Sequence, residues 1–162
     1  MTRTIVARKI AAPSELVFKT VADIREFSKV IPEITNINIL SEQQVGVGTR
    51  FQETRLMHGR EATVELEVTE YVENKKIRIV SDTNGTVWDS IFTVNETTES
   101  GSPVTELQLV MEARTSKFSG KVINFLIKGM IKKAIQNDLD VVKSHCETRS
   151  SKIRTSETEL VN

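Results

Sequence analysis

Cysteine, histidine and long apolar runs are all scarce in this sequence. The single cysteine, Cys146, excludes a disulfide scaffold and any zinc or iron–sulfur site that needs several cysteines. Two histidines, His58 and His145, are too few for most catalytic metal sites, so we expect neither a metal nor a cofactor. No apolar run approaches the roughly 20 residues of a membrane span, and we expect the first residues not to act as a signal peptide. A cytoplasmic location is the resulting expectation.

Neither sign of charge is in excess. Lys and Arg together number 22, as do Asp and Glu, so the formal net charge is zero. A dedicated nucleic-acid-binding protein is usually basic overall, and we therefore expect no nucleic-acid partner. The chain of 162 residues is long enough to close one core by itself. We predict a single domain over residues 1–148 and a polar, flexible tail over 149–162.

The spacing of apolar residues changes twice along the chain. Residues 3–11 alternate and predict a strand, and residues 14–22 and 24–30 predict two short helices capped by Ser14 and Asp23. From 34 to 113 the period is two, which predicts about six further strands, with a turn at 46–48 and a loop at 99–103. Residues 119–147 contain no proline and predict one long helix. The fold class is therefore α+β.

Only the long helix is large enough to cover one face of such a sheet. The simplest arrangement is a curved antiparallel sheet of about seven strands wrapped around that helix, with the two short helices after the first strand. Aromatic residues make up only 5% of the chain, so few large rings are present to fill the space between sheet and helix. We expect a cavity to remain there.

Several motifs occur in an order that resembles a known superfamily. They are Ala12-Pro13-Ser14-Glu15-Leu16-Val17-Phe18, the segment from Asp23 to Pro32, Gly46-Val47-Gly48-Thr49-Arg50-Phe51 and Val68-Thr69-Glu70-Tyr71. Together they resemble the START-like superfamily (SRPBCC), which includes Bet v 1-like proteins and the polyketide cyclase/dehydrase and lipid-transport-like family. The resemblance covers about residues 4–147 and implies the helix-grip fold. It also implies a hydrophobic ligand such as a lipid, a quinone or a polyketide, but superfamily members differ in function.

Alternating residues on the predicted strands, with two residues of the long helix, are the expected walls of the cavity. Core packing alone would explain the same pattern. Trp88 is the only tryptophan and would report on a bound ligand. The predicted ligand-binding residues are Phe51, Arg55, Leu66, Ile79, Trp88, Ser90, Phe92, Leu109, Met111, Leu126 and Met130.

Glu53 and Arg55 are the candidate catalytic residues. Both share a strand face with Phe51, so they either line the cavity as buried charges or lie solvated at its mouth. Arg55 is the better ligand contact, because a guanidinium binds carboxylates with two hydrogen bonds and also donates to an enolate. In a polyketide cyclase-like or dehydratase-like enzyme, Glu53 would be the acid/base and Arg55 the enolate stabiliser. Because no complete catalytic constellation is present, we expect a binding or transport protein rather than an enzyme.

The predicted long helix begins with an unusual segment, Lys117–Lys133. It contains five lysines and no acidic residue, with apolar residues nearly all round. A transient contact with an anionic membrane or with a protein partner would use these features. The alternative is that the two short helices bury this segment. The sequence leaves open whether the protein is a monomer or a homodimer.

Two other patterns do not support chemistry. The glycine turn at 46–48 leads into a strand rather than a helix, so we interpret it as a plain turn and not a phosphate loop. His145 and Cys146 are adjacent on a helix and point in different directions, which argues against a catalytic pair. His58 lies beside Gly59, and we interpret it as a solvated turn residue.

Overall fold

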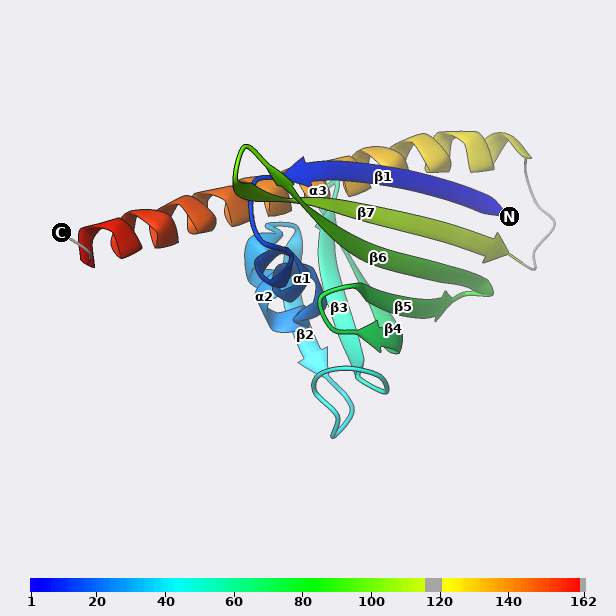
Figure 1. Ribbon diagram of the computed structural model, residues 1–162. Coiled ribbons are helices and arrows are strands. Elements are labelled where there is room, and N and C mark those ends of the chain that lie inside the picture. The colour runs from blue at the N-terminus through cyan, green and yellow to red at the C-terminus, as the bar shows by residue number, and fades with distance from the viewer. Residues whose placement is uncertain (116–120, 161–162) are drawn as a thin grey trace.

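The computed structural model of the protein describes residues 1–115 and 121–160, without the side chains of 121–127 (Figure 1). The described elements are β1 (Thr2–Ile10), α1 (Ser14–Ala22), α2 (Ile24–Val30), β2 (Ile34–Ile39), β3 (Arg50–Met57), β4 (Arg60–Val72), β5 (Lys76–Thr83), β6 (Thr86–Glu99), β7 (Ser102–Thr115) and α3 (Lys121–Leu160).

The strands form one antiparallel sheet in the order β1-β7-β6-β5-β4-β3-β2. Consecutive strands from β2 to β7 are neighbours, and β1 lies beside β7 at one edge. The sheet is curved, and α3 lies along one side of it while α1 and α2 cover one end (Figure 1). The predicted architecture of seven strands, two short helices after the first strand and one long helix is confirmed.

The connection between β6 and β7 is tighter than predicted. The loop expected at 99–103 is a two-residue turn, in which Ser100 and Gly101 have φ values of 50° and 79°. Two residues with positive φ produce the turn whose twist matches that of the flanking strands. Ser102 and Pro103 therefore belong to β7 and pair with Glu99 and Thr98.

The caps of the two short helices differ in kind. Asp23 caps α2 as predicted, since its Oδ1 accepts from the backbone N–H groups of Arg25 and Glu26 at 3.0 and 3.2 Å. Ser14 is the first residue of α1 rather than its cap, which is Pro13. The backbone N–H of Ser14 instead donates to Glu96 on β6 at 2.6 Å, so a carboxylate from the sheet satisfies that helix end.

Helix α3 continues to Leu160, beyond the end predicted near Glu147. Residues 151–160 are all exposed, and this end of the helix projects away from the sheet (Figure 1). The sequence after residue 147 is polar but contains no proline or glycine to stop a helix. Four side-chain hydroxyls, those of Ser151, Thr155, Ser156 and Thr158, bond to carbonyls three or four residues earlier in the helix.

The tightly packed core lies at the end of the sheet covered by α1. Val17 and Phe18 of α1, Ile77 and Leu107 of the sheet, and Leu139 of α3 are all at most 2% exposed. The phenyl ring of Phe18 meets Tyr71 edge to face, with centroids 5.4 Å apart. This core is contiguous and includes α3 residues from Ile135 to Cys146. The middle part of α3, from Ile135 to Cys146, therefore packs into this core.

Candidate functional site

The predicted ligand-binding residues of the strands all lie on one face of the sheet. Phe51 is directly opposite Leu66, Ile79 is opposite Ser90, and directly paired residues point to the same side. Trp88, Ser90 and Phe92 pair in turn with Ala113, Met111 and Leu109. A hydrogen bond from Arg55 to Asp138 shows that this face is the one turned toward α3. We call it the inner face.

The residues of the inner face differ in burial. Phe92, Leu109, Ile79 and Phe51 are between 2% and 9% exposed and belong to the core. Leu66, Trp88, Ser90 and Met111 are only half-buried. Core packing therefore accounts for the first group. In the second group, Leu66 and Met111 pack against the core while staying half-buried, whereas Trp88 lies outside it.

The two helix residues of the predicted set have different outcomes. Met130 is 44% exposed and does not belong to the buried core. The side chain of Leu126 lies outside the described residues. Neither placement tests a contact with ligand, so binding by these residues stays a prediction.

Glu53 and Arg55 form a cluster with a third residue, Asp138 of α3. Arg55 donates from Nε to Glu53 Oε1 at 2.5 Å and from Nη1 to Asp138 Oδ2 at 2.8 Å. The three side chains are 12–23% exposed, which is too buried for a fully solvated pair at an open mouth. Glu53 and Arg55 thus lie partly buried on the face turned toward α3, and their role as cavity-lining or catalytic residues stays a prediction.

Burial and charge oppose each other in this cluster. Burial lowers the pKa of Arg55, but the two carboxylates outweigh this effect and hold it above its ordinary value. Burial raises the pKa of Asp138, and Arg55 only partly offsets this while the negative charges of Glu33 and Glu53 add to it. Two acidic groups thus compete for one guanidinium in a weakly solvated place.

Sequence reasoning missed Asp138 because 83 residues separate it from Arg55. The acid at 138 follows Asn137 and precedes Leu139, a fully buried residue of the core. A carboxylate beside a core position of an amphipathic helix was the available signal. It did not specify which strand residue lies opposite.

Polar contacts hold the part of α3 from Asp140 to Glu147 against β1 and the residue after it. Arg8 Nε lies 2.6 Å from Asp140 Oδ1, and Lys143 Nζ donates to the carbonyl of Lys9 at 2.5 Å. Glu147 accepts from the backbone N–H of Ala11 at 3.0 Å. All of these contacts lie C-terminal to Asp138, so they hold the part of α3 from Asp140 to Glu147 against β1 and Ala11.

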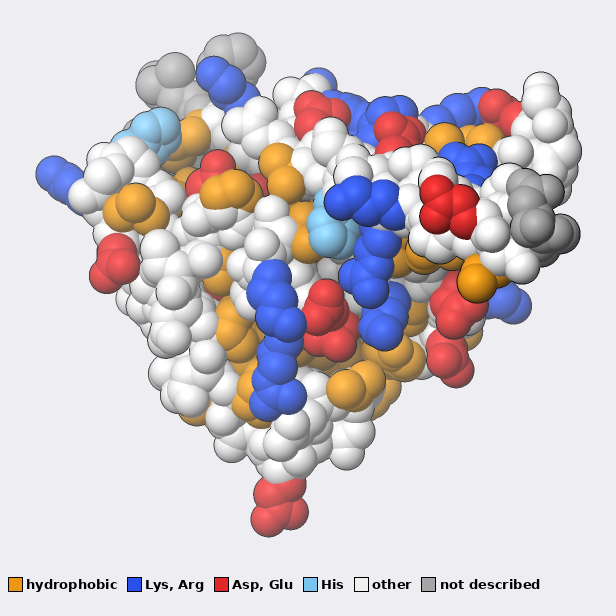
Figure 2. All heavy atoms as spheres, turned by 90° about the vertical axis from the view of Figure 1, so that its left-hand side faces the viewer, with side chains coloured by type: hydrophobic (Ala, Val, Ile, Leu, Met, Phe, Trp, Pro, Cys, Tyr) orange, Lys and Arg blue, Asp and Glu red, His pale blue; other side chains and the backbone are white. Residues whose placement is uncertain are grey.

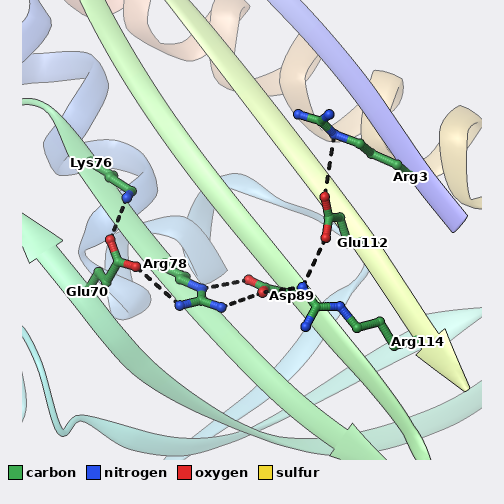
Figure 3. Close-up of polar contacts among 7 residues, drawn as sticks. All are labelled: Arg3, Glu70, Lys76, Arg78, Asp89, Glu112 and Arg114. Carbon is green, nitrogen blue, oxygen red and sulfur yellow. Dashed lines mark hydrogen bonds and ion pairs between the residues drawn. The ribbon is translucent and has the colours of Figure 1, made fainter. Parts of the chain in front are cut away.

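The opposite, outer face of the sheet carries a network of ion pairs over five strands (Figure 3). At its centre Arg78 donates two hydrogen bonds to Asp89, at 2.9 and 2.6 Å, and the Asp89 side chain is only 7% exposed. Arg78 holds the pKa of Asp89 below its ordinary value. The members are Arg3, Glu70, Lys76, Arg78, Asp89, Glu112 and Arg114. Every charge here faces a partner, which is the pattern of a stabilising surface.

A surface pocket of about 370 Å³ lies between α2 and β2. None of its lining residues belongs to the predicted binding set; they are Arg25, Ser28, Lys29, Ile34, Thr35, Asn36 and Ile37. Figure 2 shows the end of the molecule that lies on the left in Figure 1, where basic and acidic side chains are interspersed. The face seen in Figure 2 therefore carries charges of both signs.

Cys146 of α3 is a buried core residue, and His58 is an exposed residue of the β3–β4 turn. Cys146 is fully buried and its thiol lies 3.4 Å from the Thr20 hydroxyl, and burial raises its pKa. A thiol in that state is a poor nucleophile. His58 is exposed in the turn between β3 and β4, as predicted.

The basic segment Lys117–Lys133 is described only in part. Lys128, Lys132 and Lys133 are exposed, whereas Lys117 and the Lys121 side chain lie outside the described residues. Contact of this segment with a membrane or a protein stays a prediction, as does the monomer or homodimer state. Within the described ranges, no helix is long and apolar enough to cross a bilayer.

Three solved structures share this fold at low sequence identity. Ara h 8.0201 superposes with a TM-score of 0.68 at 13% identity, covering 91% of this chain and 98% of that one. The protein TTHA0849 from Thermus thermophilus gives 0.66 at 16% identity, with 94% and 99% covered. A START superfamily protein from Mycobacterium smegmatis gives 0.62 at 17% identity, with 93% and 98% covered.

Sequence comparison extends the relationship from fold to family. No curated protein matches the chain significantly. Residues 1–147, however, match the family described as polyketide cyclase/dehydrase and lipid transport. This match spans all seven strands and most of α3. The chain therefore belongs to the polyketide cyclase/dehydrase and lipid transport family, as the order of its motifs predicts.

Proposed function

We propose that the protein binds or carries a small hydrophobic ligand between the inner face of the sheet and the first half of α3. The observation that carries this proposal is that Leu66, Trp88, Ser90 and Met111 are only half-buried, whereas Phe51, Ile79, Phe92 and Leu109 on the same face are buried. Apolar surface left uncovered inside a fold favours an apolar occupant. The family, which includes lipid-transport proteins, supports the same function.

The fluorescence of Trp88 provides the test. Trp88 lies on the inner face, and it is the only tryptophan of the chain. Titration with a fatty acid, a fatty amide, a quinone and an aromatic polyketide should change its emission for at least one of these compounds. A phenyl ring introduced by Ser90→Phe should remove the response, because Ser90 lies on the inner face between Ile79 and Met111.

A matched substitution on the outer face controls for indirect effects. Thr93 is on the same strand and pairs with Lys76 and Gln108 on the opposite side of the sheet. Thr93→Phe should leave the titration unchanged. Equal loss of the response in both variants would mean that the ligand does not bind on the inner face.

A second candidate function is a cyclase-like or dehydratase-like enzyme. The Glu53–Arg55–Asp138 cluster favours it, because a buried acid with a raised pKa next to a guanidinium suits proton transfer and stabilisation of an enolate. Incubation with a synthetic β-polyketone chain tests it by mass spectrometry. Cyclised product from the wild type but not from Arg55→Ala would support the enzyme, whereas weaker binding with no turnover in either would support the carrier.

A further inference from the structure

The only cation of the Glu53–Arg55–Asp138 cluster is already occupied. Nε of Arg55 donates to Glu53 and Nη1 donates to Asp138. Both acceptors are carboxylates, and Glu33 is close enough to add its negative charge at Asp138. The sequence alone suggests that Arg55 is a good partner for a ligand carboxylate. In the structure, Arg55 is already bonded to two carboxylates of the protein.

Arg55 nevertheless has donors to spare. A guanidinium carries five N–H groups, and Nη2 bonds to none of the residues that the structure describes. The side chain is 23% exposed, so it is not sealed off by the protein. Arg55 is therefore able to donate to an acceptor that brings no further negative charge.

The cluster borders half-buried apolar residues of the inner face. Along β3 the inner-face residues are Phe51, Glu53 and Arg55, and they are paired with Leu66, Val64 and Ala62 of β4. Leu66 and Val64 are half-buried. A ligand whose apolar part covers Leu66 would bring its polar end to the cluster.

We propose that this site takes a ligand whose polar end is uncharged and accepts a hydrogen bond from Arg55, and that it rejects a carboxylate there. The inference rests on the proposed function, since it names the ligand class of the same site. A third carboxylate would face two others across one guanidinium, and the repulsion is strong because the groups are largely removed from water. An amide, ketone or ester oxygen accepts the same hydrogen bond without that repulsion. Glu53 and Asp138 thus act as specificity-determining residues through Arg55.

Two ligands of one chain length test this directly. Decanamide and decanoate differ at the head group alone, and their binding is followed by Trp88 fluorescence at pH 8. We expect the wild type to bind decanamide at least tenfold more tightly than decanoate, which is about 1.4 kcal/mol. Decylamine is the third arm. Tighter binding of decylamine than of decanamide would contradict a role for Arg55 as the donor.

The double variant Glu53→Gln/Asp138→Asn releases the guanidinium from both carboxylates. We expect the preference to shift toward decanoate by at least tenfold in this variant, while Asp82→Asn, at an exposed site on β5, leaves it unchanged. Circular dichroism checks that the variants fold. If the double variant does not fold, the single Asp138→Asn variant should shift the preference in the same direction.

The outcomes distinguish a failure of the predicted head-group preference from a failure of the proposed ligand binding. Equal binding of amide and carboxylate by the wild type, or tighter binding of decanoate, would overturn the inference and leave the proposed ligand site intact. Absence of binding by all three decyl compounds, and by the fatty acids, quinones and polyketides above, would overturn both.

Discussion

Single residues on the two faces of the sheet do different work. On the outer face, Asp89 is nearly buried and accepts two hydrogen bonds from Arg78. On the inner face, Arg55 is shared by two carboxylates. The first arrangement is balanced and stabilises the sheet. The second contains more acid than base, so its charges are not balanced among the three side chains.

Asp89→Asn should destabilise the protein by about 2 kcal/mol at pH 7, since it removes the charge from a buried pair of hydrogen bonds. The folded-state pKa of Asp89 is lowered, so its contribution is present above its unfolded pKa of about 4 and is lost as the pH falls through the folded value. Urea unfolding of wild type and variant from pH 7 to pH 2 measures both effects. The two stabilities should converge at the acid end.

Asp82→Asn is the matched control for that experiment. Asp82 is an exposed acid on the neighbouring strand β5. Its removal should change the free energy of unfolding by less than about 0.5 kcal/mol at every pH. If Asp89→Asn behaved like this control at pH 7, the ion pair with Arg78 would contribute nothing measurable.

At the scale of elements, a glycine in a turn and a glycine in the long helix should respond oppositely to substitution by alanine. Gly101 lies in the β6–β7 turn with a φ of 79°, and an added Cβ would meet no atom within 4 Å. Gly129 lies inside α3, and there too an added Cβ has open space. The two sites differ in backbone conformation and not in crowding.

Alanine substitution at these glycines should therefore have opposite signs. Gly101→Ala should cost about 1 kcal/mol, because an L-residue is strained at positive φ. Gly129→Ala should stabilise by about 0.5–1 kcal/mol, because alanine loses less backbone entropy in a helix. Thermal unfolding should show midpoints shifted in opposite directions by about 2–4 °C. A loss of stability at Gly129 would mean that this side of α3 packs against something.

The exposed end of α3 should contribute little to stability. Residues 151–160 are all exposed, and a helical segment without packing is marginal by itself. A chain that ends at Ser150 should keep the wild-type melting temperature and lose only helical signal in circular dichroism. A fall of several degrees would show that this end packs against another molecule.

Local patterns predicted the elements, whereas long-range contacts determined the site. The alternation of Ala62, Val64 and Leu66 placed β4 and its inner face, and Asp23 marked the start of α2. The full length of α3 follows from the absence of proline and glycine after residue 147, which the sequence does contain. The hydrogen bond from Ser14 to Glu96, in contrast, is a tertiary contact that no local pattern contains. For the same reason Glu53 and Arg55 could be singled out from strand spacing, but Asp138 could not.

At the scale of the whole molecule, one part of α3 anchors that helix to the rest of the fold. The helix packs into the core with its residues from Ile135 to Cys146, which lie against α1 and Leu107. Polar contacts with β1 hold the same part of α3. Asp138 lies within this anchored part of α3, so the anchor also holds the acidic cluster of the proposed site in place.

The most direct measurement is native mass spectrometry of the freshly purified protein, followed by organic extraction and identification of what is released. We predict a retained apolar molecule whose polar end is uncharged, which changes Trp88 fluorescence when added back and is absent from the Ser90→Phe variant. A mass equal to the bare chain, with no Trp88 response to fatty acids, fatty amides, quinones or aromatic polyketides, would contradict a ligand site on the inner face.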